Sequence, residues 1–85
     1  MPELPTKGAL EVALAAAGRA HHDYEQVVLK GQRDELWPGF YAAFVLGRLG
    51  DFTPASRLSL LLEQATGSDW SAAAADHVVK ALHDG

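Results

Sequence analysis

The residues best suited to chemistry stand close together in the first half of the chain: His21, His22, Tyr24 and Glu25, followed by Asp34. His21 and Glu25 are four positions apart. In a helix this spacing puts both side chains on one face, where they can share a metal ion or a proton. His21 also falls on the apolar stripe of the expected helix rather than on its solvent side. The sequence therefore marks this face as the place to look for a site.

Three roles fit the pair of His21 and Glu25. In a structural role, the histidine is a core residue hydrogen-bonded to a carboxylate or a tyrosine. In a metal site, the pair needs a third ligand, which Asp34, His77 or a second chain would supply. In an enzyme, the two side chains form an acid/base pair. We favour the structural role and expect no metal, with His21 and Glu25 as the candidate ligands if one is bound.

Catalysis and cofactor binding have little support in the sequence. No nucleophile accompanies the acid/base pair, because the serines at 56, 59, 68 and 71 lie on short helices or at their caps. The glycines mark the ends of helices and form no phosphate-binding loop. We therefore expect a non-catalytic protein that carries no cofactor.

The second feature is a stretch from Leu36 to Leu49 that has large apolar residues on nearly every side of a helix and no charge before Arg48. A helix that is apolar all round must be surrounded by its own chain, a second copy or a ligand. We therefore predict a homodimer with this helix near the two-fold axis, and contact with another protein as the alternative. The expected interface residues are Trp37, Phe40, Tyr41, Phe44 and Val45.

The same aromatic residues, with Trp70, fit a second interpretation as the wall of a small-molecule pocket. If the chain folds back at positions 31–33, the face that carries His21 comes level with the start of the second helix. The pocket would then be mostly apolar with a few polar groups. The candidate ligand-binding residues are His21, Tyr24, Glu25, Asp34, Trp37 and Tyr41.

The spacing of apolar residues, and the positions of the residues that begin or end helices, predict four helices and no strand. In the first helix, apolar residues recur three or four positions apart between Thr6, which can cap a helix, and Gly31, which can end one. Gly18 inside this helix indicates a kink or the close approach of a neighbour. Pro38 is tolerated only in the first turn of the second helix. The expected helices span about 7–30, 35–49, 54–65 and 69–83.

These elements predict an all-α fold. Short connections favour antiparallel neighbours, so the first two helices are expected to form a long hairpin that the two shorter helices cover. Asp34 is expected to cap the second helix, and Thr53, followed by Pro54, the third. Residues 1–5 are expected to form a flexible arm, and residues 6–85 a single compact four-helix domain.

Composition narrows the classes of function. The chain has 85 residues, a formal net charge of −4 and seven scattered Lys and Arg residues, so it lacks the basic face that nucleic acids and anionic membranes require. It has no cysteine, which excludes disulfides and thiolate chemistry. No signal-peptide pattern or membrane-spanning apolar run is present. We expect a cytoplasmic protein that binds neither nucleic acid nor membrane.

Two motifs, H-H-x-Y-E at 21–25 and G-x-x-D-x-x-W-P-x-F-Y-A at 31–42, resemble a pattern in a group of small bacterial α-helical proteins. In that group a His-x-x-Tyr-Glu segment precedes an Asp-x-x-Trp-Pro-x-aromatic-Tyr-Ala segment. The resemblance is confined to the first half of the chain. The resemblance transfers no catalytic or binding role, because the group has no established activity. It singles out His21, Tyr24, Glu25, Asp34, Trp37, Pro38 and Tyr41.

Overall fold

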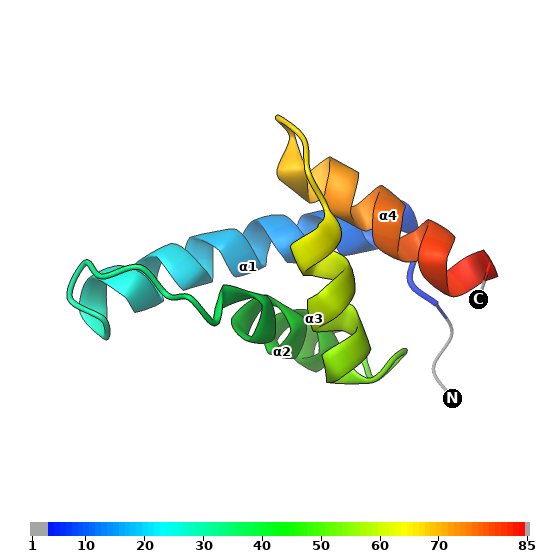
Figure 1. The fold of residues 1–85 in the computed structure, drawn as a ribbon. Helices are drawn as coiled ribbons and strands as arrows, with labels where there is room; N and C mark the ends of the chain where they lie inside the picture. The colour runs from blue at the N-terminus through cyan, green and yellow to red at the C-terminus, as the bar shows by residue number, and fades with distance from the viewer. Residues whose placement is uncertain (1–3, 85) are drawn as a thin grey trace.

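The computed structural model describes residues 4–84 and contains four α-helices in that range, with no strand. The all-α class and the four helices predicted from the sequence are confirmed. Most of the arm predicted for residues 1–5 lies outside the described residues. The helices are α1 (Lys7–Val27), α2 (Trp37–Leu49), α3 (Ala55–Gln64) and α4 (Trp70–Asp84) (Figure 1).

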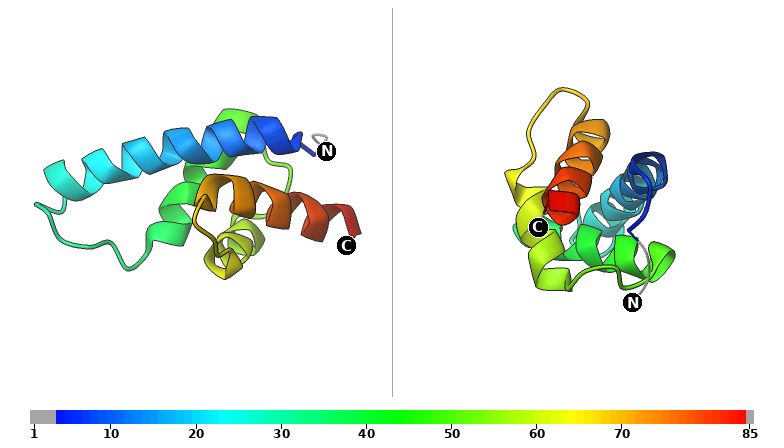
Figure 2. Two further views of the ribbon diagram at one scale, coloured as in Figure 1. Left: turned by 90° about the horizontal axis from the view of Figure 1, so that it is seen from above. Right: turned by 90° about the vertical axis from the view of Figure 1, so that its right-hand side faces the viewer.

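The four helices form a ring in which each one packs on two others. α1 and α2 form a hairpin, α3 packs on α2, and α4 packs on both α3 and α1. α4 runs antiparallel to α1 along the N-terminal half of α1, whereas the other half of α1 extends past α4 (Figures 1 and 2). α3 and α4 therefore cover one end of the hairpin, although α4, with 15 residues, is longer than α2, with 13, and not shorter as predicted. The other end, with its connecting loop, is built by α1 and α2 alone.

One hydrophobic core lies where the four helices meet. Small side chains on α1 and α4, such as Ala13 and Ala74, are fully buried and let these two helices approach closely. Each fully buried leucine contributes on the order of 1.5–3 kcal/mol. The core side chains are Leu10, Ala13, Leu14, Ala42, Val45, Leu46, Phe52, Leu58, Leu61, Leu62, Ala74, Ala75 and Val78.

The first helix ends at Val27 rather than at about residue 30. Lys30 and Gly31 both adopt positive φ, 55° and 86°, and the Gly31 N–H donates to the Glu25 carbonyl at 2.8 Å. Glycine adopts a positive φ without a steric cost, whereas for lysine this conformation is unfavourable. Because Lys30 already has a positive φ, the turn begins before Gly31, the residue that predicts it in the sequence.

The second helix begins at Trp37, with Pro38 in its first turn, rather than at about residue 35. The missing N–H of Pro38 leaves no helical bond unmade there. The prediction that Asp34 caps this helix is wrong, because Leu36 occupies the N-cap position. Asp34 instead closes a turn ahead of the helix, accepting from the Leu36 N–H at its Oδ1 over 2.9 Å.

The third helix begins at Ala55 with Pro54, rather than Thr53, at its N-cap. The extended backbone of Pro54, with ψ at 144°, keeps this residue outside the helix. Thr53 is buried and does not cap.

The chain covers more of the stretch from Leu36 to Leu49 than its composition suggests. Val45 is 0% exposed, so it belongs to the core and is not available as an interface residue in this fold. Trp37, Phe40, Tyr41 and Phe44 are half-buried. The residues of α2 and its N-cap that stay exposed are Leu36, Gly39, Ala43, Gly47 and Arg48. Within residues 4–84, no helix combines the length and apolar character needed to cross a bilayer.

Candidate functional site

The imidazole of His21 lies between two carboxylates at the exposed end of the hairpin. His21 is only 7% exposed. Its Nε2 is hydrogen-bonded to Asp34 Oδ2 at 2.9 Å, and its Nδ1 lies 3.6 Å from Glu25 Oε1. Both ring nitrogens therefore face acidic groups of the same chain, and only the imidazolium form can present an N–H to each.

The same carboxylates fix the loop between α1 and α2. Glu25 Oε2 accepts from the Asp34 N–H at 2.9 Å, which ties the loop backbone to α1. The hydrogen bond from His21 is the main reason that the pKa of Asp34 lies below its ordinary value of 3.8, with a further contribution from the Leu36 N–H. Asp34 is thus an ionised acceptor that joins the loop to both helices.

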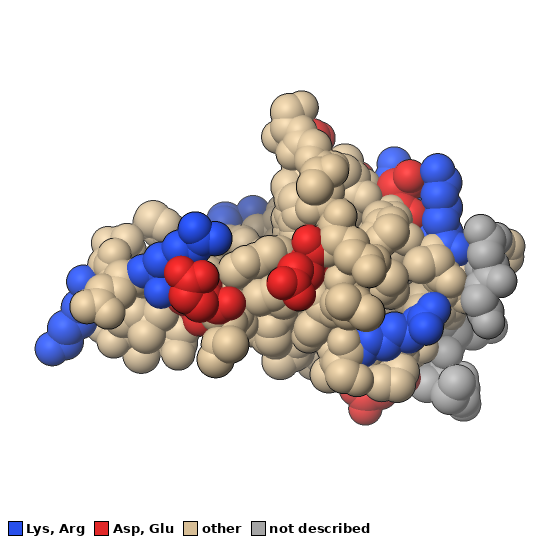
Figure 3. Space-filling model, in the orientation of Figure 1, with Lys and Arg blue, Asp and Glu red and all other residues tan. Residues whose placement is uncertain are grey.

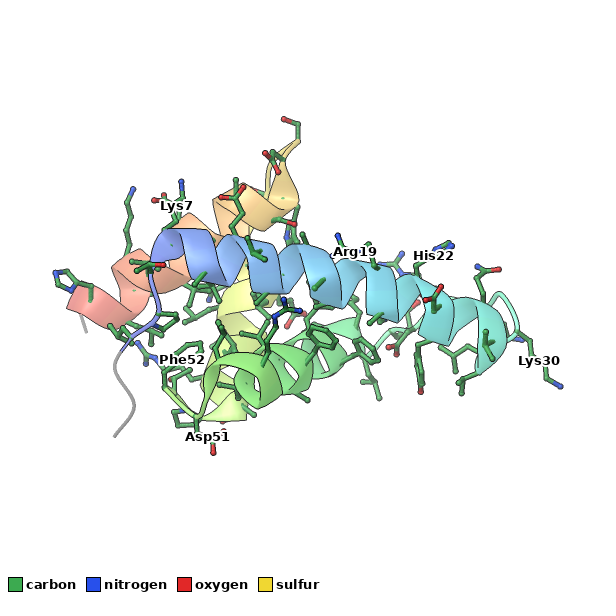
Figure 4. The ribbon with its side chains drawn as sticks, turned by 180° about the vertical axis from the view of Figure 1, so that it is seen from behind. Lys7, Arg19, His22, Lys30, Asp51 and Phe52 are labelled. Carbon is green, nitrogen blue, oxygen red and sulfur yellow. The ribbon has the colours of Figure 1, made fainter. Side chains whose placement is uncertain are left out.

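His22, the neighbour of His21, takes no part in this arrangement. It is exposed, and it lies with Arg19 on the side of α1 that is turned away from α2 (Figure 4). His77, considered as a third metal ligand, is hydrogen-bonded through Nε2 to Gln64 Oε1 at 3.1 Å and stands on α4. Among the described residues, no group of three His, Cys, Asp or Glu side chains is placed to hold a metal ion.

Beside the His21 network, three aromatic rings form what we call the aromatic corner: Trp37, Tyr41 and Trp70. The ring centroids are 5.5 Å apart for Trp37 and Tyr41, 5.6 Å for Trp37 and Trp70, and 5.3 Å for Tyr41 and Trp70. The corresponding interplanar angles are 85°, 80° and 80°. Each pair of rings is therefore nearly perpendicular, an edge-to-face arrangement that aromatic side chains favour.

Tyr41 connects the aromatic corner to the backbone of α1. A Cβ added at Gly18 would stand 3.3 Å from the Tyr41 hydroxyl oxygen, so Gly18 leaves the room that this hydroxyl needs. Partial burial, and then the negative charge of Glu25, raise the pKa of Tyr41 above 10.0. The phenol therefore stays protonated and neutral at physiological pH.

The network and the aromatic corner border one cleft of about 350 Å³. This volume suits a small organic molecule. Side chains reach the cleft from α1, from the loop after it, from α2 and from the first turn of α4. The lining residues are His21, Glu25, Arg33, Asp34, Trp37, Tyr41 and Trp70.

Five of the six candidate ligand-binding residues border this cleft. The exception is Tyr24, whose ring packs on Phe40 with centroids 5.2 Å apart. Arg33 also lines the cleft, although it was not among the candidate ligand-binding residues. Its position next to Asp34 was the available signal. Trp70 was grouped with the aromatic residues, but it was not among the candidate ligand-binding residues.

Comparison of the chain with known protein families, with curated proteins and with solved structures finds no match. The site must therefore be interpreted from its own geometry.

Proposed function

We propose that this chain is a small, non-catalytic binding protein and that the cleft beside His21 is its ligand site. The observation that carries the proposal is the cleft itself, in which an apolar wall of three rings stands against a fixed set of charged groups. Binding sites for small molecules combine these two features: apolar walls that supply affinity and a few positioned polar groups that orient the ligand.

The arrangement of His21 supports binding rather than catalysis. A general base needs a nitrogen within hydrogen-bond reach of the substrate proton. Both nitrogens of His21 face Asp34 and Glu25 instead. The side chains that line the cleft include no hydroxyl or thiol apart from the Tyr41 phenol, whose raised pKa opposes ionisation.

Intrinsic fluorescence provides a direct test. The chain has two tryptophans, and both line the cleft, so a bound molecule changes the environment of every indole in the protein. The experiment titrates a panel of cationic, anionic and neutral fragments at up to millimolar concentration, with chemical-shift mapping as the second readout. For at least one class of fragment, we expect saturable changes in fluorescence and in chemical shift, and the shifted residues should be those that line the cleft. A panel with no saturable response in either readout rejects the proposal.

A second candidate function is a homodimeric interaction module, favoured by the outer side of α2. Leu36, Gly39, Ala43 and Gly47 are exposed there, and Leu36 is 80% exposed. In the view of Figure 3, the surface over the first turns of α2 is largely uncharged. The small side chains would let a second α2 approach closely.

The charges at the two ends of α2 favour a second copy of this chain as the occupant. Exposed Arg33 and Glu35 precede the helix, and exposed Arg48 and Asp51 lie at its other end. In an antiparallel pair related by a two-fold axis, each end meets the opposite end of the partner helix. Each end offers one acid and one base, so the charges can be matched in pairs.

Light scattering at micromolar concentration tests the dimer. We expect a dimeric mass for the native chain and a monomeric mass for Ala43→Glu, which places a charge among the exposed small residues of α2. The control is Val12→Glu, because Val12 is an exposed apolar residue of α1. This variant should remain dimeric. A monomeric native chain rejects the homodimer and leaves the ligand site unaffected.

A further inference from the structure

We infer that the ligand of the cleft is an organic cation, an ammonium group that carries methyl or other alkyl substituents. This inference rests on the proposed function and adds to it the chemical class of the ligand. Three observations carry it: the mutual geometry of the aromatic rings, their fixation by neighbouring groups, and the balance of charge around the cleft.

The aromatic corner has the dimensions of a cation site. The three ring centroids are 5.3 to 5.6 Å apart, so a group about 4 Å above the middle of the triangle they form lies within the ~6 Å range of cation–π attraction of each centroid. A single ammonium group at that point is within reach of Trp37, Tyr41 and Trp70 together.

Two of the three rings, those of Trp70 and Tyr41, are held in place before any ligand arrives. The Trp70 indole N–H donates to the Ala65 carbonyl at 3.2 Å, and the Tyr41 hydroxyl lies against the backbone at Gly18. Tyr41 also packs beside His21, with ring centroids 5.3 Å apart. A wall that is already ordered does not lose further conformational entropy on binding, so more of the interaction energy appears as affinity.

The charged groups beside the aromatic corner are two carboxylates, the His21 imidazole and one guanidinium. Glu25 and Asp34 both line the cleft, and their carboxylates hold His21 between them. Arg33 is the one lysine or arginine among the lining residues. Its Nε lies 3.7 Å from Glu35 Oε1, and both side chains are largely exposed, so their charges offset one another. The carboxylates of Glu25 and Asp34 are therefore the acidic groups available to a cation at the rim.

Alkyl substituents suit the cleft better than a bare ammonium group. An unsubstituted ammonium ion is strongly hydrated and loses that hydration on entering a site walled by rings. Alkyl groups weaken this hydration and spread the positive charge over a surface that contacts the ring faces. The volume of about 350 Å³ leaves room for a trialkylated head and a short chain beyond it.

The deciding experiment compares choline with its neutral isostere, 3,3-dimethyl-1-butanol, by tryptophan fluorescence and chemical-shift mapping on the full chain. The two probes have nearly the same shape and differ in charge. We expect choline to bind at least about tenfold more tightly, the equivalent of 1.4 kcal/mol, within the range of a desolvated cation–π contact. Benzoate, an anion with a ring, should bind more weakly than choline.

A matched pair of variants locates the charge effect. Glu25→Gln keeps an acceptor for the Asp34 N–H and removes one negative charge. It should therefore weaken choline binding several-fold and leave the affinity for the isostere unchanged. Glu63→Gln removes one negative charge from an exposed site on α3, and it should change neither the affinity for choline nor the affinity for the isostere. Circular dichroism of each variant confirms that it folds.

The outcomes separate this inference from the proposed function. Equal affinity for choline and the isostere, or preference for benzoate, overturns the organic cation and leaves the cleft as a binding site. If neither these probes nor any fragment of the panel binds, the proposed function fails as well. The comparison of choline with its isostere uses the native chain, so it decides the inference even where a variant does not fold.

Discussion

His21 Nε2 lies 2.9 Å from Asp34 Oδ2, and this contact joins the C-terminal half of the chain's first helix to the loop that follows it. The partners are 13 positions apart in sequence. Because Asp34 also accepts from the Leu36 N–H, one carboxylate sets both the path of the loop and the approach to α2. The cleft depends on this contact, since Arg33 and Trp37 reach it from the two sides of Asp34.

The Asp34 contact predicts a loss of stability in acid. Folding lowers the pKa of Asp34 below 3.8, so the native state favours the ionised carboxylate more than the unfolded chain does. The resulting stabilisation is complete above the unfolded value and disappears as the pH falls through the lower folded value. Urea unfolding of the native chain and of Asp34→Asn, between about pH 5 and pH 2, should show a stability difference that shrinks across the lower part of this range. A difference that is constant with pH contradicts the assignment.

The contact between Gly18 and Tyr41 predicts that the effect of Gly18→Ala on stability depends on the Tyr41 hydroxyl. In a helix interior, Gly→Ala normally stabilises by about 1 kcal/mol. At Gly18 the new Cβ would stand 3.3 Å from the Tyr41 hydroxyl, so the gain should be smaller than this or absent. In a Tyr41→Phe background the hydroxyl is gone, and Gly18→Ala should recover most of the expected gain. Denaturant unfolding of the four chains measures the difference, and equal gains in both backgrounds contradict the contact.

The helices could be predicted from the sequence because their signals are local. Thr6 caps the first helix as the sequence indicates, Pro38 falls in a first turn, and apolar spacing locates the buried faces. The boundaries near Val27 and Trp37 differ from the prediction for a physical reason. The loop between them is shaped by Glu25 and Asp34 through contacts with its backbone, and spacing within a helix does not report such contacts.

The site was predictable only in part. Helical spacing puts His21 and Glu25 on one face, and folding back of the chain brings Asp34 toward them. Trp70 reaches the cleft because α4 lies antiparallel along the N-terminal half of α1 (Figure 2), which places its first residue beside Trp37 and Tyr41. That placement follows from how four helices pack together, and no local pattern in the sequence encodes it.

The phenol of Tyr41 should ionise at higher pH than an ordinary tyrosine. Partial burial and the charge of Glu25 both oppose the phenolate. Because the folded pKa is raised, the associated stability is complete below about pH 10 and is lost as the pH rises through the folded value. The chain has two tyrosines, so Tyr24→Phe isolates Tyr41. Its ultraviolet titration should have a midpoint above 10, and adding Glu25→Gln should lower it. A midpoint at or below 10 in the folded variant contradicts the prediction.

The cap of α1 should contribute measurable stability at a distance from the cleft. Thr6 Oγ1 accepts from the Ala9 N–H at 3.1 Å, which satisfies one of the N–H groups that the first turn leaves free. Thr6→Ala should therefore cost about 1 kcal/mol, and Thr6→Ser much less, because serine keeps the acceptor. Thr66→Ala is the matched control, since Thr66 is exposed in the loop after α3. Urea unfolding measures all three variants, and equal losses for Thr6→Ala and Thr66→Ala would show that the cap contributes nothing specific.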